Sequence, residues 1–220
     1  RDVDRGLIET GHERWLEWAS RLDNNGAAAT EKIITHENGR RLLDGIFANS
    51  PYLTQLCLRE QACMVTILQT DPTEVFDQLL VDLQQIDAAH MGFEPLMKAL
   101  RVVKRRGALA IAIADITNYW PLEKITLAIT QLAETTLTQA FRHALTQVTK
   151  RGRLPGRQNL NDSSDDCLIG SGLICLAMGK MGGHELNYSS DIDIIVLYDN
   201  ELPCYADFPE VQRGFVEVTR

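Results

Sequence analysis

The chain has 220 residues, of which 45% are hydrophobic and 24% are charged, a mixture typical of a globular protein with its own core. Its formal net charge of −8 repels a phosphate backbone, which argues against a general DNA- or RNA-binding protein. No apolar run approaches the ~20 residues of a membrane span, no secretory signal is apparent, and the five scattered cysteines form no CxxC pair, so we expect a cytoplasmic protein with reduced thiols.

Residues 1–150 have apolar side chains at the 3.6-residue period of helices. The first helix is expected around residues 15–18 and the second over residues 33–47. Pro51 and Pro72 each follow a polar residue and mark the start of a further helix, because proline is tolerated in a first turn.

Two longer helices are expected next, over residues 94–116 and from Pro121 to about residue 148. The second of them carries a continuous apolar stripe. A stripe of that length needs a partner surface, so the pattern predicts a helical bundle.

The composition changes after residue 150. Residues 151–170 are rich in Gly, Pro, Asn, Asp and Ser, which predicts a loop or linker. Strands are then expected over residues 172–178 and 191–198, and a last helix over residues 210–220. We therefore predict a mainly α chain: a helical domain (1–150), a loop (151–170) and the start of a small α/β sheet (171–220).

Asp191 and Asp193 are the first candidates for a functional site. Residues i and i+2 of a strand point to the same side, so the two carboxylates are expected to project together at the rim of a buried sheet. Two adjacent carboxylates repel each other unless a cation neutralises them. Oxygen ligands of this kind suit Mg²⁺, which commonly binds through carboxylates and substrate phosphates.

A glycine-containing segment lies between the two expected strands. Gly182 and Gly183 allow a tight turn whose backbone N–H groups can hold phosphate oxygens, with the hydroxyls of Ser189 and Ser190 nearby. Lys180 is a further candidate for phosphate contact. A phosphate-binding turn that faces a metal site suits phosphoryl or nucleotidyl transfer with two metal ions.

These residues resemble a known family. Gly182-Gly183 followed by Ser190-Asp-Ile-Asp193 is similar to the signature of the nucleotidyltransferase superfamily, so the sheet resembles the start of a nucleotidyltransferase sheet. The longer string from Met178 to Asp193 resembles glutamine-synthetase adenylyltransferase, the bifunctional enzyme that adds AMP to a tyrosine of glutamine synthetase and removes it. The helical part from about residue 41 onward is also similar to this family.

The resemblance implies a reaction and its partners. The sequence Glu185-Leu-Asn-Tyr-Ser-Ser190 resembles the N-terminal, adenylyl-removing half of the enzyme. In that half, phosphate releases AMP from adenylyl-tyrosine as ADP. By the match, Asp191 and Asp193 hold Mg²⁺, expected as two ions and replaceable by Mn²⁺, and the glycines and Ser190 contact phosphate. Glutamine synthetase, the PII signalling protein, and AMP, ADP or ATP are the implied partners.

The family supplies a third carboxylate from a later strand, and no matching segment exists in this sequence. Asp199, Glu201 and Asp207 are poor substitutes, because they are expected in loops. The chain is therefore expected to be a piece of a longer enzyme that is inactive alone. The adenylylating half of the same enzyme, a related enzyme acting on nucleic acid, and a non-catalytic docking module for glutamine synthetase or PII stay open as alternatives.

Overall fold

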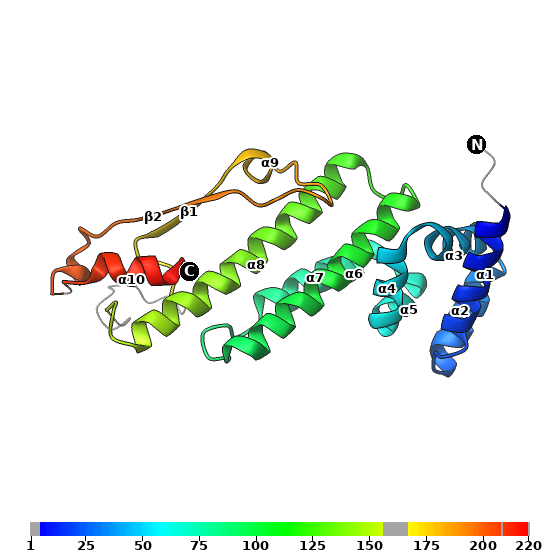
Figure 1. Ribbon diagram of the computed structural model, residues 1–220, viewed down its shortest axis with the longest axis horizontal. Coiled ribbons are helices and arrows are strands. Elements are labelled where there is room, and N and C mark those ends of the chain that lie inside the picture. Colours follow the sequence, from blue (N-terminus) through cyan, green and yellow to red (C-terminus); the bar gives the residue numbers. More distant parts are fainter. Residues whose placement is uncertain (1–4, 156–166, 208, 220) are drawn as a thin grey trace. The chain divides into compact units, whose positions relative to one another are not determined.

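The computed structural model describes residues 5–155, 167–207 and 209–219. The chain forms two compact units, Arg1–Val81 with Arg101–Ile125 and Asp82–Leu100 with Thr126–Arg220. The domain boundaries expected at residues 150 and 170 stay predictions. In the order labelled in Figure 1, the helices before residue 151 are α1 (Arg5–Ala19), α2 (Asn24–Ile34), α3 (Glu37–Asn49), α4 (Pro51–Arg59), α5 (Gln61–Gln69), α6 (Pro72–Gln84), α7 (Phe93–Ile116) and α8 (Leu122–Lys150).

The expected chain order of helices is largely confirmed. Pro51 and Pro72 do begin α4 and α6, and the two long helices end within a few residues of their expected bounds. The single helix expected over residues 33–47 is wrong, since α2 ends at Ile34 and α3 begins at Glu37. His36 between them has an extended backbone (φ −95°, ψ 129°), which interrupts the helical hydrogen bonds.

Two tryptophans organise the core of the first unit. Trp18 is fully buried, lies 5.8 Å from the ring of Phe47 and donates from Nε1 to the carbonyl oxygen of Cys57 at 3.2 Å. Trp15 donates to the carboxylate of Asp44 at 2.6 Å. Gly11 allows α1 to approach α3 closely, because a methyl group there would lie 2.7 Å from the Asp44 carbonyl oxygen. The apolar face of α1 therefore packs against α3.

A buried carboxylate ties α7 to the α4–α5 junction within the same unit. Glu60, 6% exposed, accepts from Nε of Arg105 at 2.7 Å and from Nε of Arg106 at 2.8 Å. Burial opposes ionisation of this carboxyl, but the hydrogen bonds from Arg106 and Arg105 outweigh it and hold the pKa of Glu60 below its usual value.

Replacing Glu60 by Gln is expected to lower the free energy of unfolding at pH 7 by about 2 kcal/mol, the scale of a hydrogen bond to a charged group. Because the folded-state pKa is lowered, this stability is fully present above the unfolded-state pKa of about 4.3 and is lost as the pH falls below it. Urea unfolding of both proteins from pH 7 to pH 3 measures the difference, which should shrink toward the acid end. Glu17→Gln, in the exposed pair with Arg21, is the control and should change the free energy of unfolding little. Equal stability of Glu60→Gln and wild type at pH 7 would contradict the prediction.

The second unit contains most of α8, whose buried polar side chains bond carbonyl oxygens at the end of α6 and in the loop that follows it. Gln139, with no exposed surface, donates from Nε2 to the carbonyl oxygens of Leu83 at 2.7 Å and Gln84 at 3.0 Å. His143 bonds the carbonyl oxygen of Ala88 at 2.9 Å. The last carbonyl groups of a helix lack partners within it, so Gln139 satisfies two of these groups at the end of α6.

The two expected strands are present and pair with each other, but both are shorter than expected. β1 (Leu173–Ala177) pairs antiparallel with β2 (Ile194–Tyr198), from Leu173 opposite Tyr198 to Ala177 opposite Ile194. In the described part of the chain no strand precedes Arg151, which confirms a mainly α fold with a small sheet. None of the described helices is long and apolar enough to cross a membrane.

One end of the sheet is anchored in an apolar core formed by α8, the 3-10 turn at Pro203–Tyr205 and α10 (Val211–Val218). The ring of Tyr198 stacks on that of Phe215 at 4.6 Å, and Tyr205 meets the same ring edge-on at 5.6 Å. The Tyr205 hydroxyl donates to the carbonyl oxygen of Ser171, just before β1. The strand ends at Leu173 and Tyr198 are therefore the fixed ends of the hairpin.

The expected buried sheet is wrong for one of its two faces. Register places Ile174 beside Leu197 and Leu176 beside Ile195, and all four side chains are 44–47% exposed. Leu173 and Tyr198, on the opposite face, pack against the apolar core. Within the described chain the helical core packs on this second face at its Leu173–Tyr198 end, so a two-stranded sheet that looked apolar on both sides is exposed on one.

Candidate active-site segment

The candidate residues lie on the connection between β1 and β2, at the sheet end opposite the anchored one. The glycine segment between the strands is a short helix, α9 (Gly179–Gly182), rather than the open turn expected. It is entered through Gly179 at φ +53° and left through His184 at φ +57°. A left-handed backbone at both ends lets the chain turn sharply away from the strand and back again.

Gly182 and Gly183 use their backbone N–H groups within this helical turn. They donate to the carbonyl oxygens of Met178 and Gly179, each at 3.1 Å. A methyl group at Gly182 would lie only 2.5 Å from the carbonyl oxygen of Ala177, so glycine is required there for close packing on β1. Both N–H groups are thus engaged within the turn, and phosphate contact by these two glycines stays a prediction.

Asp191 and Asp193 precede β2 instead of beginning it. The expectation of a strand from Asp191 is wrong, because the ladder stops at Ile194 and is extended only by a bond from Met178 N–H to the Asp193 carbonyl oxygen at 2.9 Å. Beyond that bond β1 has turned into α9, so no partner strand remains. The two acids are therefore on an exposed connection, where the alternation of side chains along a strand does not place them on one face.

The structure does bring the glycine segment next to one acid. A methyl group at Gly179 would lie 3.8 Å from Oδ2 of Asp193. Across residues 5–155, 167–207 and 209–219, no hydrogen bond or ion pair reaches the side chain of Asp191 or Asp193. Two exposed carboxylates without partners among the described residues can accept a cation without first breaking a salt bridge to any of them.

The donor set of this segment suits a hard cation only in part. No group of three or more His, Cys, Asp or Glu side chains with metal-binding geometry occurs among the described residues. Asp199, one of the weak substitutes for a third carboxylate, caps the N–H of Glu201 at 2.9 Å beyond the opposite end of β2. Asp191 and Asp193 would thus hold Mg²⁺ together with water and substrate phosphate, a mode that is common for this ion.

The remaining candidates lie on the same connection between β1 and β2. Lys180 is exposed on α9 and Ser189 is exposed on the connection. Ser190 has its hydroxyl bonded to Asn187, as acceptor at 3.0 Å and as donor at 2.9 Å. The sequence analysis did not single out Asn187. A signal was present, because an Asn side chain often closes a turn by accepting a hydrogen bond from the backbone two residues later.

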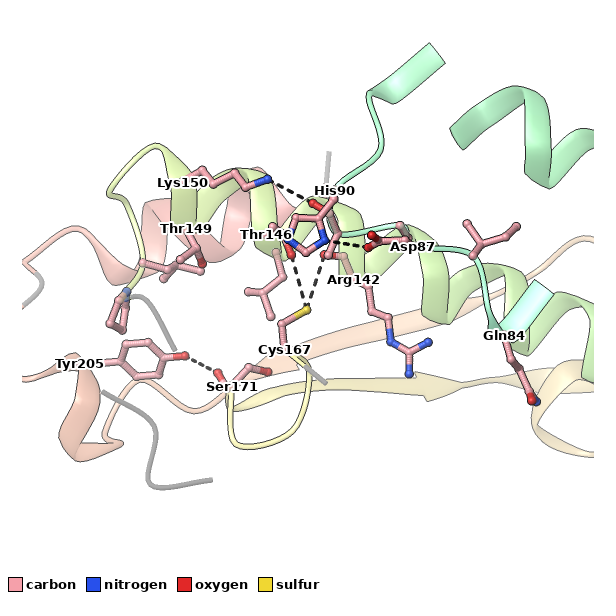
Figure 2. Close-up of a pocket in the computed structure, with 16 residues that line it drawn as sticks. Gln84, Asp87, His90, Arg142, Thr146, Thr149, Lys150, Cys167, Ser171 and Tyr205 are labelled. Carbon is pink, nitrogen blue, oxygen red and sulfur yellow. Dashed lines mark hydrogen bonds and ion pairs between the residues drawn. The ribbon is translucent and has the colours of Figure 1, made fainter. Parts of the chain in front are cut away.

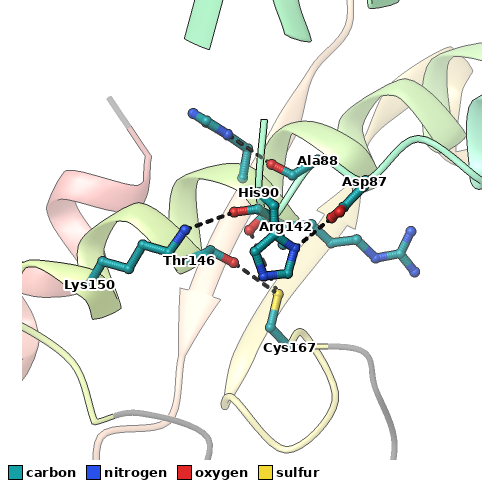
Figure 3. Close-up of polar contacts among 9 residues, drawn as sticks. Asp87, Ala88, His90, Arg142, Thr146, Lys150 and Cys167 are labelled. Carbon is teal, nitrogen blue, oxygen red and sulfur yellow. Dashed lines mark hydrogen bonds and ion pairs between the residues drawn. The ribbon is translucent and has the colours of Figure 1, made fainter. Parts of the chain in front are cut away.

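A separate cavity of about 470 Å³ lies in the second unit (Figure 2). Its polar side chains bond to neighbours that line the same cavity: His90 to Asp87 at 2.8 Å, Lys150 to the Ala89 carbonyl oxygen at 3.3 Å, and Thr146 to the sulfur of Cys167 at 3.6 Å (Figure 3). The cavity also includes Ser171, just before β1, and so lies at the anchored end of the sheet, away from the acids.

Comparison with known proteins agrees with the motif. Residues 41–212 match the family profile described as glutamate-ammonia ligase adenylyltransferase. The chain is 37% identical over 213 residues to the bifunctional glutamine synthetase adenylyltransferase/adenylyl-removing enzyme of Rhodopseudomonas palustris strain BisB5, and 36% identical over 212 residues to that of Bradyrhizobium sp. strain BTAi1. Each match covers 96% of this chain and 21% of the relative, so the chain spans about a fifth of these proteins. No solved structure matches the chain.

Proposed function

The chain belongs to the glutamate-ammonia ligase adenylyltransferase family, and from this premise we propose that it supplies part of the site that removes AMP from glutamine synthetase. The observation that carries the proposal is the pair of exposed carboxylates, Asp191 and Asp193, on the connection between β1 and β2, with Asp193 next to Gly179. The rest of the site, including a third carboxylate, belongs to the longer enzyme.

The proposed reaction is a phosphorolysis. An oxygen of orthophosphate forms a bond to the AMP phosphorus, the bond from that phosphorus to the tyrosine oxygen breaks, and the products are ADP and tyrosine, whose phenolate takes up a proton. A phenol with a pKa of about 10 is a poor leaving group at neutral pH. Bound Mg²⁺ would supply charge neutralisation for the entering and leaving oxygens.

The residues of this chain have defined tasks in that scheme. Asp191 and Asp193 bind the cation, while Lys180, exposed on α9, attracts the phosphate oxygens. Gly179 leaves the space beside Asp193 open, since any side chain there would reach its carboxylate. The net charge of −8 disfavours nucleic acid as the alternative substrate. PII as a regulator and a cytoplasmic location are part of the same proposal.

The choice of the adenylyl-removing half is tested in the full-length enzyme that contains this chain. Asp193→Asn is expected to abolish ADP release from adenylylated glutamine synthetase with Mg²⁺ and phosphate, and to leave ATP-dependent AMP transfer intact. Both rates are measured on the same preparation. Loss of AMP transfer with retention of ADP release assigns the chain to the adenylylating half, and retention of both rates assigns it to a docking role.

A further inference from the structure

The positions of Asp191 and Asp193 are set by their main chain, because no described side chain holds either carboxylate. Asp193 is fixed on one side by the bond from Met178 N–H at 2.9 Å. Asp191 has no strand or helix around it, so its position depends on the residues immediately before it. These begin at Leu186, which is 2% exposed and anchors the connection in the interior.

Asn187 closes the chain just before Asp191 into a tight turn. Its side-chain oxygen Oδ1 accepts from the Ser189 N–H at 3.0 Å and from the Ser190 hydroxyl at 2.9 Å. Its own N–H donates to the Ser190 hydroxyl oxygen at 3.0 Å, and its carbonyl oxygen accepts from the Ser190 N–H at 3.2 Å. Four bonds between three residues fix the backbone up to the peptide bond that leads into Asp191.

We propose that Asn187 and Ser190 form a clamp that positions Asp191 for metal binding; this rests on the function proposed above. In the clamp the Ser190 hydroxyl both donates and accepts toward Asn187. Its main task is then to close the turn, and not to contact phosphate. Asn187 is a positioning residue: it acts on the cation through the main chain of Ser190 and Asp191.

The clamp predicts that replacing Asn187 lowers the affinity for metal ions. In the full-length enzyme, Asn187→Ala is expected to weaken binding of Mn²⁺ alone, measured by electron paramagnetic resonance, by about 10- to 100-fold, the range seen when partners that orient metal ligands are removed. Asn187→Asp keeps an acceptor oxygen in the same place and is expected to restore most of the affinity. Asn200→Ala, an exposed Asn beyond the far end of β2, is the matched control and should bind as wild type.

A double-mutant cycle separates the clamp from independent roles. If Asn187 and Ser190 act as one unit, adding Ser190→Ala to Asn187→Ala should change Mn²⁺ affinity and the rate of ADP release by little more than either substitution alone. Fully additive effects, or an Asn187→Ala variant with wild-type Mn²⁺ affinity, would overturn the clamp.

Asp191→Asn, measured alongside, distinguishes failure of the clamp from failure of the proposed function. If both Asp191→Asn and Asn187→Ala leave the Mn²⁺ affinity unchanged, the proposed function itself fails. If Asp191→Asn weakens Mn²⁺ binding and Asn187→Ala does not, only the clamp is refuted.

Discussion

Asp191→Asn in the full-length enzyme is expected to slow ADP release from adenylylated glutamine synthetase by about 1000-fold. Metal ions supply several kcal/mol of transition-state stabilisation, and each 1.4 kcal/mol corresponds to about tenfold in rate. An amide in place of the carboxylate removes one of the two carboxylates proposed to bind the metal ion. The rate is measured at saturating phosphate over a range of Mg²⁺ and Mn²⁺ concentrations, and high metal should recover only a fraction of it.

The same substitution should leave the fold nearly unchanged. Asp191 is exposed and makes no described hydrogen bond or ion pair, so surface-type effects within about ±0.5 kcal/mol are expected on unfolding. Asp207→Asn removes the same charge elsewhere on the surface and is the control with an unchanged rate. A full rate in Asp191→Asn would show that the carboxylate is not a metal ligand in the reaction.

Phe215→Ala is expected to lower the free energy of unfolding of the second unit by about 3–5 kcal/mol, the usual cost of deleting a buried aromatic ring. Phe215 is 1% exposed, stacks on Tyr198 of β2 at 4.6 Å and meets Tyr205 edge-on at 5.6 Å. Its loss removes the contact that holds the fixed end of the hairpin. Hydrogen exchange of the β1 and β2 amides should therefore speed up strongly, and urea unfolding should move to lower denaturant.

The neighbouring Val216→Ala serves as the matched control. Val216 is 40% exposed on the same helix, so its truncation is expected to cost about 0.5 kcal/mol or less. Equal exchange rates for the β1 amides in Phe215→Ala and Val216→Ala would show that α10 does not anchor the sheet. Because the acids lie at the other end of the hairpin, Phe215→Ala should reduce activity through the stability of the fold and leave the Mn²⁺ affinity of the folded protein close to wild type.

The sequence by itself determined the long helices, two helix starts and the family. Helical periodicity identified α7 and α8 to within a few residues, and the prolines at 51 and 72 marked two helix starts, because these signals are local properties of the chain. The string from Met178 to Asp193 pointed to the adenylyltransferase family, and the match over residues 41–212 confirms it.

Only the tertiary structure decided how the candidate site is built. β-branched residues after Asp191 predicted a strand from that residue, but a strand needs a partner, and β1 has already turned into α9 at Gly179. The exposure of one sheet face depends on which helices pack there, which no periodicity reports. The Asn187–Ser190 turn is likewise a matter of hydrogen bonds between particular atoms: the Ser190 hydroxyl bonds to Asn187, a contact that the sequence did not predict, and its contact with phosphate stays a prediction.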